Sequence, residues 1–359
     1  MARKGENIYK RKDGRWEGRW IISHECGKAK YGYIYAKTYS EVRTELSFRR
    51  QNELTNKISS GKKLKSYYSN WIELIQLNRK ESTCVKYRSI IEKHILPSFG
   101  ELSMQQISTS DVGAFLLKKQ QAGLSPSTVN GIKTVLKMFM NYIDSQNAVC
   151  NFSELRIKKG ACNLRVLSND EQNKLCQFLK KDMDCCKLGV YLCLFTGLRI
   201  GELCALRWKN VLTDRKVIYV ESTMQRIKSE SGGTKIVITS PKSISSRRVI
   251  PITDALAAVL EKYKASENSY VLSGSEDSFI EPRTLQYRFK KYIEAAGISA
   301  ANFHSTRHTF ATRCIENGVD VKSLSEILGH SNIGITLNRY VHSSLEFKRE
   351  NMEKLLSIM

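Results

Sequence analysis

The sequence of 359 residues lacks the long hydrophobic runs of a membrane protein and the leading segment of an exported one. Its longest apolar stretch, Leu188 to Leu198, is far shorter than the roughly 20 residues that cross a bilayer. Its first residues, Met1 to Lys4, lead into polar sequence rather than into the apolar core of a signal peptide. These two absences predict a soluble protein that is not exported.

Patterns of cysteine and histidine that would bind a metal or form a disulfide framework are also missing. The ten cysteines are scattered, without a Cys-x-x-Cys pair and without a histidine at metal-ligand spacing. Cys176, Cys193 and Cys204 lie inside apolar patterns and are predicted to be buried free thiols. A reducing cytosol fits this use of cysteine.

Positive charge, in contrast, is in excess along the whole chain. The 58 Lys and Arg residues outnumber the 35 Asp and Glu residues, which gives a formal net charge of +23. A membrane surface as partner would require a basic amphipathic helix or a lipidation signal, and the charge is not confined to such a segment. Nucleic acid is therefore the predicted partner. The length and the 41% of hydrophobic residues predict two or three domains with cores of their own.

Residues 1–58 are predicted to form a small three-stranded sheet backed by one helix. The alternating segments 7–12, 15–22 and 30–36 have the pattern of strands, and Asp13-Gly14 between the first two is a strong hairpin signal. A helix is expected from about Ser40, because that residue is a natural N-cap and apolar residues follow it near helical spacing.

The strands of this unit interleave large aromatic residues with basic ones, a combination that could lie in a DNA groove. The alternative is an aromatic core beneath solvated charge, but a sheet this small can bury only part of the aromatic set. The predicted DNA contacts of this unit are Lys10, Arg11, Lys12, Arg15, Trp16 and Arg19.

Residues 64–148 carry helical periodicity and are predicted to form a second, all-helical unit. Ser82 is expected to cap a helix that Pro97 stops, and Pro126 is expected to open the last helix. Apolar residues recur along that last helix at three- and four-residue steps: Val129, Ile132, Val135, Leu136 and Phe139. Its exposed face carries two further predicted DNA contacts, Lys133 and Lys137. The module could cup one side of a duplex or be a generic bundle.

A basic linker at 151–165 precedes the last domain, which is predicted to be mostly helical with a small antiparallel sheet. Ser168 to Glu171 has the pattern of a capping box at the start of a helix. Strands are predicted at 217–221, 235–239 and 247–252, and later helices from about Ala255, Pro282 and Phe303. The fold class predicted for the whole chain is multidomain α+β.

Four of the six histidines lie near the C-terminus, between His304 and His342. His304 and Arg307 stand at i and i+3, so both side chains leave one face of a helix. His330 follows a short helix that Gly329 is expected to cap. Tyr340 comes about two and a half helical turns after Ser331. This clustering predicts a functional site.

An independent signal is the segment Thr196 to Leu203, which places Arg199 and Glu202 at i and i+3 on a helix after a glycine turn. Standing alone, this pair would be a structural ion pair. Lys242 lies in a turn between two predicted strands, from which it could reach a ligand or remain solvated. Two further predicted phosphate contacts are Arg207 and Lys209.

In order and context, these residues resemble the tyrosine recombinases, and within them the integrases of phages and conjugative transposons. The shared motifs are Thr-Gly-Leu-Arg-x-x-Glu-Leu, the hairpin lysine, His-x-x-Arg-His, Leu-Gly-His-Ser and the final Arg-Tyr, spread over residues 166–345. The resemblance implies an arm-type DNA-binding domain at 1–58, a helical core-binding domain at 64–148, and a catalytic domain with a C-terminal helix at 166–359.

The resemblance implies a site-specific recombinase that cuts and rejoins DNA through a covalent 3′-phosphotyrosine, without metal or other cofactor, to integrate and excise a mobile genetic element. Tyr340 would be the nucleophile, His304 would take its proton, and Lys242 would protonate the leaving 5′-oxygen. The residues assigned to catalysis are Arg199, Lys242, His304, Arg307, His330 and Tyr340, with Glu202 and His308 in supporting roles. The two arginines would bind the phosphate, because guanidiniums are planar and always charged.

The implied partners are double-stranded DNA with core-type and arm-type sites, three further protomers in a homotetramer, and an excisionase or a host DNA-bending protein. The implied location is the bacterial cytoplasm, at the nucleoid. Residues 344–359 have apolar side chains on one helical face, which would pack either on the neighbouring protomer or on the chain's own domain.

Two other functions compete with this one. A non-catalytic DNA-binding regulator is possible because the short helices around Asn317-Gly318 could pass for a helix-turn-helix. That alternative leaves Arg199, Lys242 and Tyr340 without a role. A type IB topoisomerase shares the chemistry but has no need of an arm-binding sheet.

Overall fold

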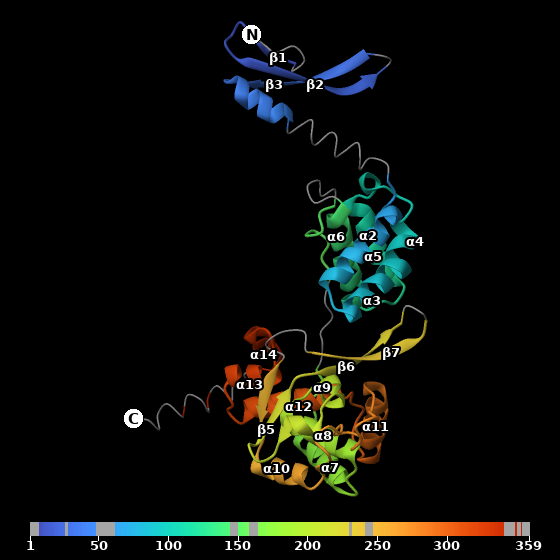
Figure 1. The fold of residues 1–359 in the computed structure, drawn as a ribbon, viewed down its shortest axis with the longest axis vertical. Helices are drawn as coiled ribbons and strands as arrows, with labels where there is room; N and C mark the ends of the chain where they lie inside the picture. The colour runs from blue at the N-terminus through green and yellow to red at the C-terminus, as the bar shows by residue number, and fades with distance from the viewer. Residues whose placement is uncertain are drawn as a thin grey trace. The chain divides into compact units, whose positions relative to one another are not determined.

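The computed structural model describes residues 7–25, 28–47, 62–143, 150–157, 164–229, 232–240, 247–340, 349 and 353. The chain divides into two compact units, Met1–Gly160 and Ala161–Met359. Both are built mainly from helices, with small antiparallel sheets (Figure 1). The predicted α+β fold class is confirmed.

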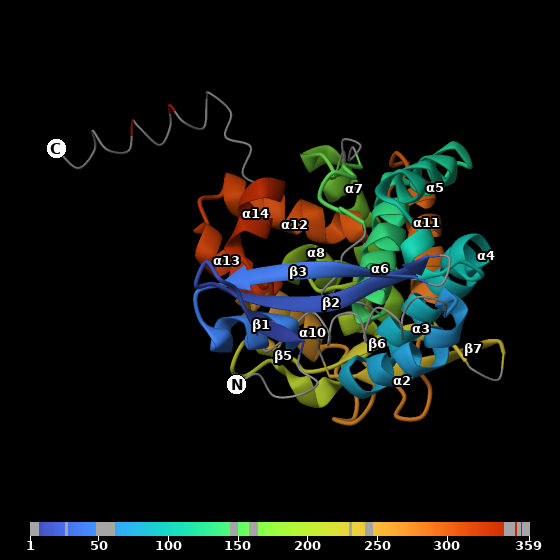
Figure 2. The same cartoon turned by 90° about the horizontal axis from the view of Figure 1, so that it is seen from above.

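The first unit begins with the expected three-stranded sheet, whose strand order is β1-β2-β3 (Figure 2). The strands are β1 (Ile8–Lys10), β2 (Trp16–Glu25) and β3 (Lys28–Ala36), all antiparallel. Gly14 in the first hairpin has φ +85°, a conformation that favours glycine. A helix over residues 39–47 covers one sheet face, and its buried Val42 and Leu46 pack with Ile8.

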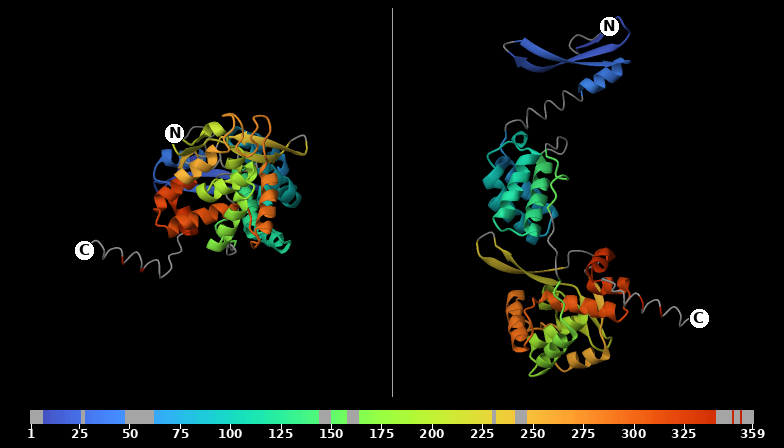
Figure 3. Two further views of the ribbon diagram at one scale, coloured as in Figure 1. Left: turned by 90° about the horizontal axis from the view of Figure 1, so that it is seen from below. Right: turned by 180° about the vertical axis from the view of Figure 1, so that it is seen from behind.

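Five α-helices form a bundle in the rest of the described first unit (Figure 3). They are α2 (Tyr68–Asn78), α3 (Glu81–Ile90), α4 (Leu96–Phe99), α5 (Thr109–Gln121) and α6 (Pro126–Ile143). Short turns of other helix types are η1 (Leu64–Tyr67), η2 (Ile91–Ile95) and η3 (Met104–Gln106). The five apolar residues predicted to line the last helix are all buried in the bundle core.

The helix that is expected to begin at Ser82 and to stop at Pro97 begins and ends at other residues in the structure. It begins after Lys80, and it continues through the π turn η2 into α4, where Pro97 occupies the first turn. A proline is tolerated there because the first N–H groups of a helix have no partner within it. Gly100 rather than Pro97 follows the last helical residue.

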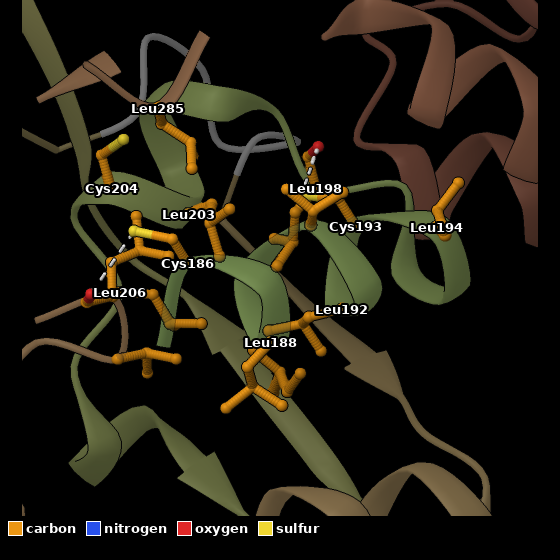
Figure 4. Packing of buried hydrophobic residues seen from close by; sticks show 14 of the residues in the cluster. Cys186, Leu188, Leu192, Cys193, Leu194, Leu198, Leu203, Cys204, Leu206 and Leu285 are labelled. Atoms are coloured by element: carbon orange, nitrogen blue, oxygen red, sulfur yellow. Dashed lines mark hydrogen bonds between the residues drawn. The ribbon is translucent and has the colours of Figure 1, made fainter. Parts of the chain in front are cut away.

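The second unit surrounds α8 (Cys185–Thr196) with other helices. The others are α7 (Asn169–Lys180), α9 (Ile200–Cys204), α10 (Asp254–Glu261), α11 (Pro282–Ala295), α12 (His304–Glu316), α13 (Val321–Leu328) and α14 (Ile333–Tyr340), with the 3₁₀ turn η4 (Trp208–Asn210). The capping box of Ser168 and Glu171 opens α7 as predicted. Because α8 is apolar around most of its circumference, it lies in the core of the unit (Figure 4).

The strands of the second unit form a three-stranded sheet of order β4-β5-β8 and a separate hairpin of β6 and β7. Their bounds are β4 (Val211–Leu212), β5 (Val217–Val220), β6 (Thr223–Lys228), β7 (Thr234–Thr239) and β8 (Arg248–Pro251). The sequence predicted β5, β7 and β8 but missed β4 and β6. Two residues are too few to show a period, and β6 has only Met224 and Ile227 as buried apolar residues.

The cysteines of this core are free thiols. Cys193 and Cys204 are buried, as predicted, and Cys176 is half-buried at the edge of the core. Figure 4 shows Cys193 beside Leu192, Leu194 and Leu198 in the apolar packing. Burial raises the pKa of Cys193 well above its usual value. These thiols therefore act as small apolar side chains.

Candidate active site

The C-terminal end of α13 is the point where three arginines from three different elements meet. Gly329 ends this helix in a left-handed conformation, with φ +65°. The last carbonyls of a helix have no partner within it, so they are free to accept other donors. Three consecutive backbone carbonyls each accept a hydrogen bond from a different arginine. The carbonyl of Ile327 accepts from Arg248 Nε, that of Leu328 from Arg307 Nη2 at 2.7 Å, and that of Gly329 from Arg199 Nη2 at 3.1 Å.

Glu202 joins two of these arginines through its buried carboxylate, which is 5% exposed. Oε1 accepts from Arg199 Nη1 at 2.8 Å and from Arg248 Nη1 at 3.0 Å. Oε2 accepts from Arg248 Nη2 and from the backbone N–H of Arg199, both at 2.9 Å. Burial alone would raise the pKa of Glu202, but the hydrogen bonds and charges of Arg248 and Arg199 outweigh it and lower the pKa to about 2.

Arg307 is the most deeply buried of the three arginines, at 2% exposed. Its Nη1 donates to the carbonyl of Gly197 at 2.7 Å, so it bridges the ends of α8 and α13. Burial and then the charge of Arg199 lower the pKa of Arg307 to about 9, which leaves it charged at neutral pH. Two guanidiniums are thereby held near each other with only partial compensation by Glu202, an arrangement suited to an anion.

His330 lies directly after α13 and is oriented at both ring nitrogens. Arg307 Nη2 lies 3.0 Å from Nε2, and Thr336 Oγ1 lies 2.8 Å from Nδ1. Since the arginine can only donate, Nε2 accepts and Nδ1–H donates to the threonine. Burial, followed by the charges of Arg307 and Arg199, lowers the pKa of His330 to about 3. The ring is therefore neutral in these surroundings.

Tyr340 ends α14 with its side chain turned into the unit and only 6% exposed. Its hydroxyl lies 2.8 Å from Nδ1 of His308, and its ring is parallel to that of His330 at 6.5 Å between centroids. Burial raises the pKa of Tyr340, although the charges of Arg307 and Arg339 act against this. Arg307, His330 and Tyr340 lie on or directly after α12, α13 and α14, and these three helices pack against one another (Figure 1).

The structure thus brings together four of the six residues predicted to be catalytic: Arg199, Arg307, His330 and Tyr340. His304 begins α12 with an exposed side chain and contacts His308 edge-on, at 4.5 Å between ring centroids. Lys242 lies outside the described residues. Sequence reasoning missed Arg248, because its partner Glu202 lies 46 positions earlier and no local pattern links the two.

Comparison with known proteins identifies the family. The pattern of the Phage integrase family matches residues 165–346, and that of the Phage integrase, N-terminal SAM-like domain matches residues 63–120. The chain belongs to the phage integrase family. It is a tyrosine recombinase, an enzyme that recombines DNA at specific sites.

Relatives of this recombinase include two that match nearly its whole length. A XerC-like tyrosine recombinase of Caldanaerobacter subterraneus is 29% identical, over 92% of this chain and 93% of its own. The transposase from transposon Tn916 of Enterococcus faecalis is 26% identical, over 99% of this chain and 96% of its own.

Solved structures agree on the fold. The Tn1549 transposon integrase in complex with a circular intermediate DNA has a TM-score of 0.67 and 22% identity, and the match covers 82% of this chain and all of that one. A lambda integrase dimer bound to a core site has a TM-score of 0.59 and 19% identity, over 95% and 96% of the two chains.

The N-terminal sheet of the recombinase has two unlike faces, and the uncovered one carries most of its predicted DNA contacts. Tyr9, Glu17 and Tyr35 stand in one row across the three strands, and Arg19 pairs with Tyr33 in the next. The tyrosines of this face are nearly half exposed, and the arginines lie over their rings: Arg11 and Arg15 over Tyr35, Arg19 over Tyr9 and Tyr33. Lys12 is exposed.

Glu17 is buried at 5% beneath this face and holds two of its arginines. Its carboxylate accepts from Arg11 Nη1 and from Arg19 Nε, each at 2.7 Å. These hydrogen bonds, Arg19 first, lower the pKa of Glu17. The two guanidiniums are therefore fixed in place rather than free to move.

Of the remaining predicted DNA contacts, Lys10, Trp16, Lys133 and Arg207 contact other residues of the protein. Trp16 faces the covering helix and packs edge-on against Tyr39 at 5.1 Å, with Lys10 over its ring, because strand alternation places it opposite Glu17. Lys133 donates to the carbonyl of Leu155. Arg207 donates to the Asn268 carbonyl and to the Tyr270 hydroxyl. Lys137 and Lys209 are exposed, as predicted.

The described residues contain no group of three or more His, Cys, Asp or Glu side chains arranged to hold a metal ion. Within the same residues, none of the helices has both the length and the apolar character needed to cross a membrane.

Proposed function

We propose that this recombinase integrates and excises a mobile genetic element, and that it cuts DNA with Tyr340. The observation that carries the proposal is the meeting of Arg199, Arg307, His330 and Tyr340, from four parts of one unit, around one buried group of charges. Its place of action is the DNA of the bacterial cytoplasm.

The arginines are proposed to bind the phosphate that is cut. Negative charge grows on its non-bridging oxygens as a nucleophile adds, and preorganised donors stabilise it without reorganising during the reaction. Arg199 and Arg307 are held by helix-end carbonyls before any DNA binds, which supports this role. Each such donor is typically worth about 3 kcal/mol, so loss of either is expected to slow cleavage by about a hundredfold.

The tyrosine is proposed to form the covalent link. Attack of Tyr340 on phosphorus would leave a 3′-phosphotyrosine and release a 5′-hydroxyl, and a 5′-hydroxyl of another duplex could reverse the step without ATP. An unperturbed phenol, with a pKa of about 10, needs a neighbouring base at neutral pH. The resemblance gives this role to His304, the role of general acid to Lys242, and a hydrogen bond with the phosphate to His330.

A mobile element as substrate is supported by the names of similar proteins. The relatives include the transposase from transposon Tn916, and the solved structures include a Tn1549 transposon integrase with circular intermediate DNA. Lambda integrase was solved as a dimer on a core site and as a tetramer on a Holliday junction. We extend these observations to a tetramer of this chain on DNA, with an excisionase or a DNA-bending protein as a further partner.

The division of labour between domains is likewise proposed. Residues 64–148 and 166–359 would hold the core-type site, and residues 1–58 would bind the arm-type site. The aromatic and basic face of the N-terminal sheet supports the second assignment. The C-terminal segment 344–359, apart from positions 349 and 353, lies outside the described residues, and its packing on a neighbouring protomer stays a prediction.

A nicked suicide substrate that carries the element's end tests the proposed chemistry. The wild type is expected to form a covalent protein–DNA adduct, since the released fragment cannot return for religation. Tyr340→Phe keeps the ring and removes the nucleophile, so it should give no adduct while still binding the DNA. A wild type without adduct would overturn the proposal in favour of a regulator, and supercoil relaxation without strand exchange would favour a topoisomerase.

The arm-site assignment predicts that binding and cleavage can be separated. Substitution of both Arg11 and Arg19 by Gln should weaken binding to arm-type DNA at least tenfold, because two charge-assisted phosphate contacts are lost. Adduct formation on core-type DNA should stay within about twofold of the wild type. Gel-shift and suicide-substrate assays measure the two quantities, and a parallel loss of both would contradict the assignment.

A further inference from the structure

The hydroxyl of Tyr340 contacts His308, not the exposed His304 that the resemblance names as its base. We propose that His308 Nδ1 accepts the phenolic proton when Tyr340 attacks the phosphate. His304 then acts on the reaction through its edge-on contact with the His308 ring. This inference rests on the proposed role of Tyr340 as nucleophile.

The geometry is that of a general base with its substrate proton. The distance of 2.8 Å between Oη and Nδ1 is within the roughly 2.6–3.2 Å needed for direct transfer. The two side chains are 6% and 5% exposed, so little water competes for the hydrogen bond. The ring centroids lie 5.6 Å apart with the planes tilted by 49°, which leaves the nitrogen in the direction of the hydroxyl.

The surroundings keep His308 in the form that can accept a proton. Arg307 and His304 approach it from its own helix, and Arg339 and Tyr340 approach from α14. Burial, followed by the charges of His304, Arg339 and Arg307, lowers the pKa of His308 to about 4. The proposed role places the proton of the neutral ring on Nε2, so that the Nδ1 lone pair faces the phenol.

A histidine with so low a pKa is a weak base until DNA arrives. A phosphate bound by Arg199 and Arg307 brings negative charge beside Arg307, which is one of the cations that lower the pKa of the His308 ring. An opposite charge nearby favours the protonated form of an imidazole, so substrate binding raises its basicity. The base therefore becomes effective when the phosphate is in place.

The proton balance of the step is complete. The bond from Tyr340 Oη to phosphorus forms while the bond from phosphorus to the 5′-oxygen breaks. The phenolic proton passes to His308 Nδ1, and the leaving oxygen takes a proton from the general acid, proposed to be Lys242. In religation the deprotonated general acid takes the proton of the incoming 5′-hydroxyl, and His308 returns the first proton to the departing phenol.

Two asparagine variants of the same helix test the assignment on the nicked substrate. His308→Asn places an amide oxygen near the position of Nδ1, so it can accept the hydrogen bond but not the proton. Its rate of adduct formation is expected to fall about a hundredfold, within the range of general-base contributions. His304→Asn is the matched comparison and is expected to lose at least tenfold less. Thermal unfolding and binding of the same DNA show whether each variant is folded.

A second readout reports basicity and not position. Incorporation of 3,5-difluorotyrosine at residue 340 lowers the pKa of the phenol and reduces its need for a base. The fluorinated nucleophile should speed His308→Asn by about tenfold more than it speeds the wild type. His308→Ala, which opens a space beside the hydroxyl, should recover part of its rate with added imidazole.

The outcomes separate the two levels of the proposal. Equal effects of fluorination in the wild type and in His308→Asn, without rescue by imidazole, would overturn the role of His308 and leave a structural contact. A larger loss in His304→Asn than in His308→Asn would return the role to His304. A wild type that forms no adduct would overturn the proposed function itself, and this inference with it.

Discussion

At the scale of single residues, Glu202 connects the largest number of charged groups in the candidate site. Its two oxygens accept four hydrogen bonds from Arg199 and Arg248, and both of those arginines also donate to the end of α13. Removal of the carboxylate charge would leave two guanidiniums near Arg307 without their counter-ion. A buried ion pair of this kind is costly to break from one side.

Glu202→Gln is therefore expected to lower the free energy of unfolding by about 3 kcal/mol, because an amide offers one acceptor oxygen and turns two donors toward an arginine. Urea denaturation followed by circular dichroism measures the change. Adduct formation should fall as well, because the guanidinium of Arg199 loses its carboxylate partner and keeps only the Gly329 carbonyl. Glu294→Gln removes an exposed carboxylate paired with Lys290 at 3.7 Å and should change stability by less than about 0.5 kcal/mol. Equal effects of the two substitutions would contradict this account.

At the scale of elements, the turn between α8 and α9 helps to position both of the arginines that are proposed to bind phosphate. Gly197 caps α8 with φ +64°, its carbonyl accepts from Arg307, and Arg199 follows as the N-cap of α9. A Cβ on Gly197 would lie 2.6 Å from Phe310 Cδ1 and 2.9 Å from Leu328 Cδ2. The turn thus requires glycine for its backbone conformation and for the space around it.

Gly197→Ala is expected to destabilise the protein by about 3 kcal/mol, from a left-handed conformation and from overpacking together. Gly318→Ala is the matched control, because its φ is +78° and a Cβ there would meet nothing within 4 Å. The free energy of unfolding of the control should fall by only roughly 1–2 kcal/mol, which is the cost of a left-handed backbone at a residue with a Cβ. Thermal unfolding measures both, and cleavage should fall in Gly197→Ala alone. Similar losses in the two variants would mean that packing at the turn is unimportant.

At the scale of the whole molecule, positive charge has two separate uses. Most of the net charge of +23 is proposed to give a sequence-independent grip on DNA that weakens with added salt. A small part is concentrated at the candidate active site, where Arg199, Arg248 and Arg307 face the end of one helix. Burial, followed by this positive charge, lowers the pKa of the nearby histidines, which links stability to pH.

Stability is expected to fall between about pH 6.5 and pH 5, since the folded pKa values of His308 and His330 are about 4 and about 3. An unfolded histidine titrates near 6.5, so the unfolded chain binds more protons in this range and acid favours unfolding. The lowered pKa values of His304 and His94 act in the same direction. Glu202, whose folded pKa is about 2, contributes a further loss of stability only below about pH 4.5, where its carboxyl in the unfolded chain begins to bind protons.

Urea denaturation at a series of pH values measures this dependence. The double variant with His308→Asn and His330→Asn removes the two titrating groups, so its slope against pH should be shallower than that of the wild type. The wild type should regain its stability when the pH is returned to neutral. A wild-type curve that is flat between about pH 7 and pH 5 would contradict the prediction.

Much of the fold could be predicted from the sequence because its signals are local. The turn at Asp13-Gly14, the helix opened by Pro126 and the capping box of Ser168 depend on residues one to four positions apart. The limits of such signals are visible at Pro97, which does not stop its helix, and at β6, which has too few apolar residues to show a period. The family motifs indicated the candidate active-site residues but not the contacts that these residues make.

The sequence by itself determined the helical units, the small sheets and the residue types of a phosphate-binding site. Only the tertiary structure decided that Arg248 completes the arginine group and that His308 is the histidine at the hydroxyl of Tyr340. The physical reason is distance along the chain, since the partners of these contacts lie 46 and 32 positions apart. Contacts of that separation follow from how α9, β8, α12 and α14 pack, which no local pattern encodes.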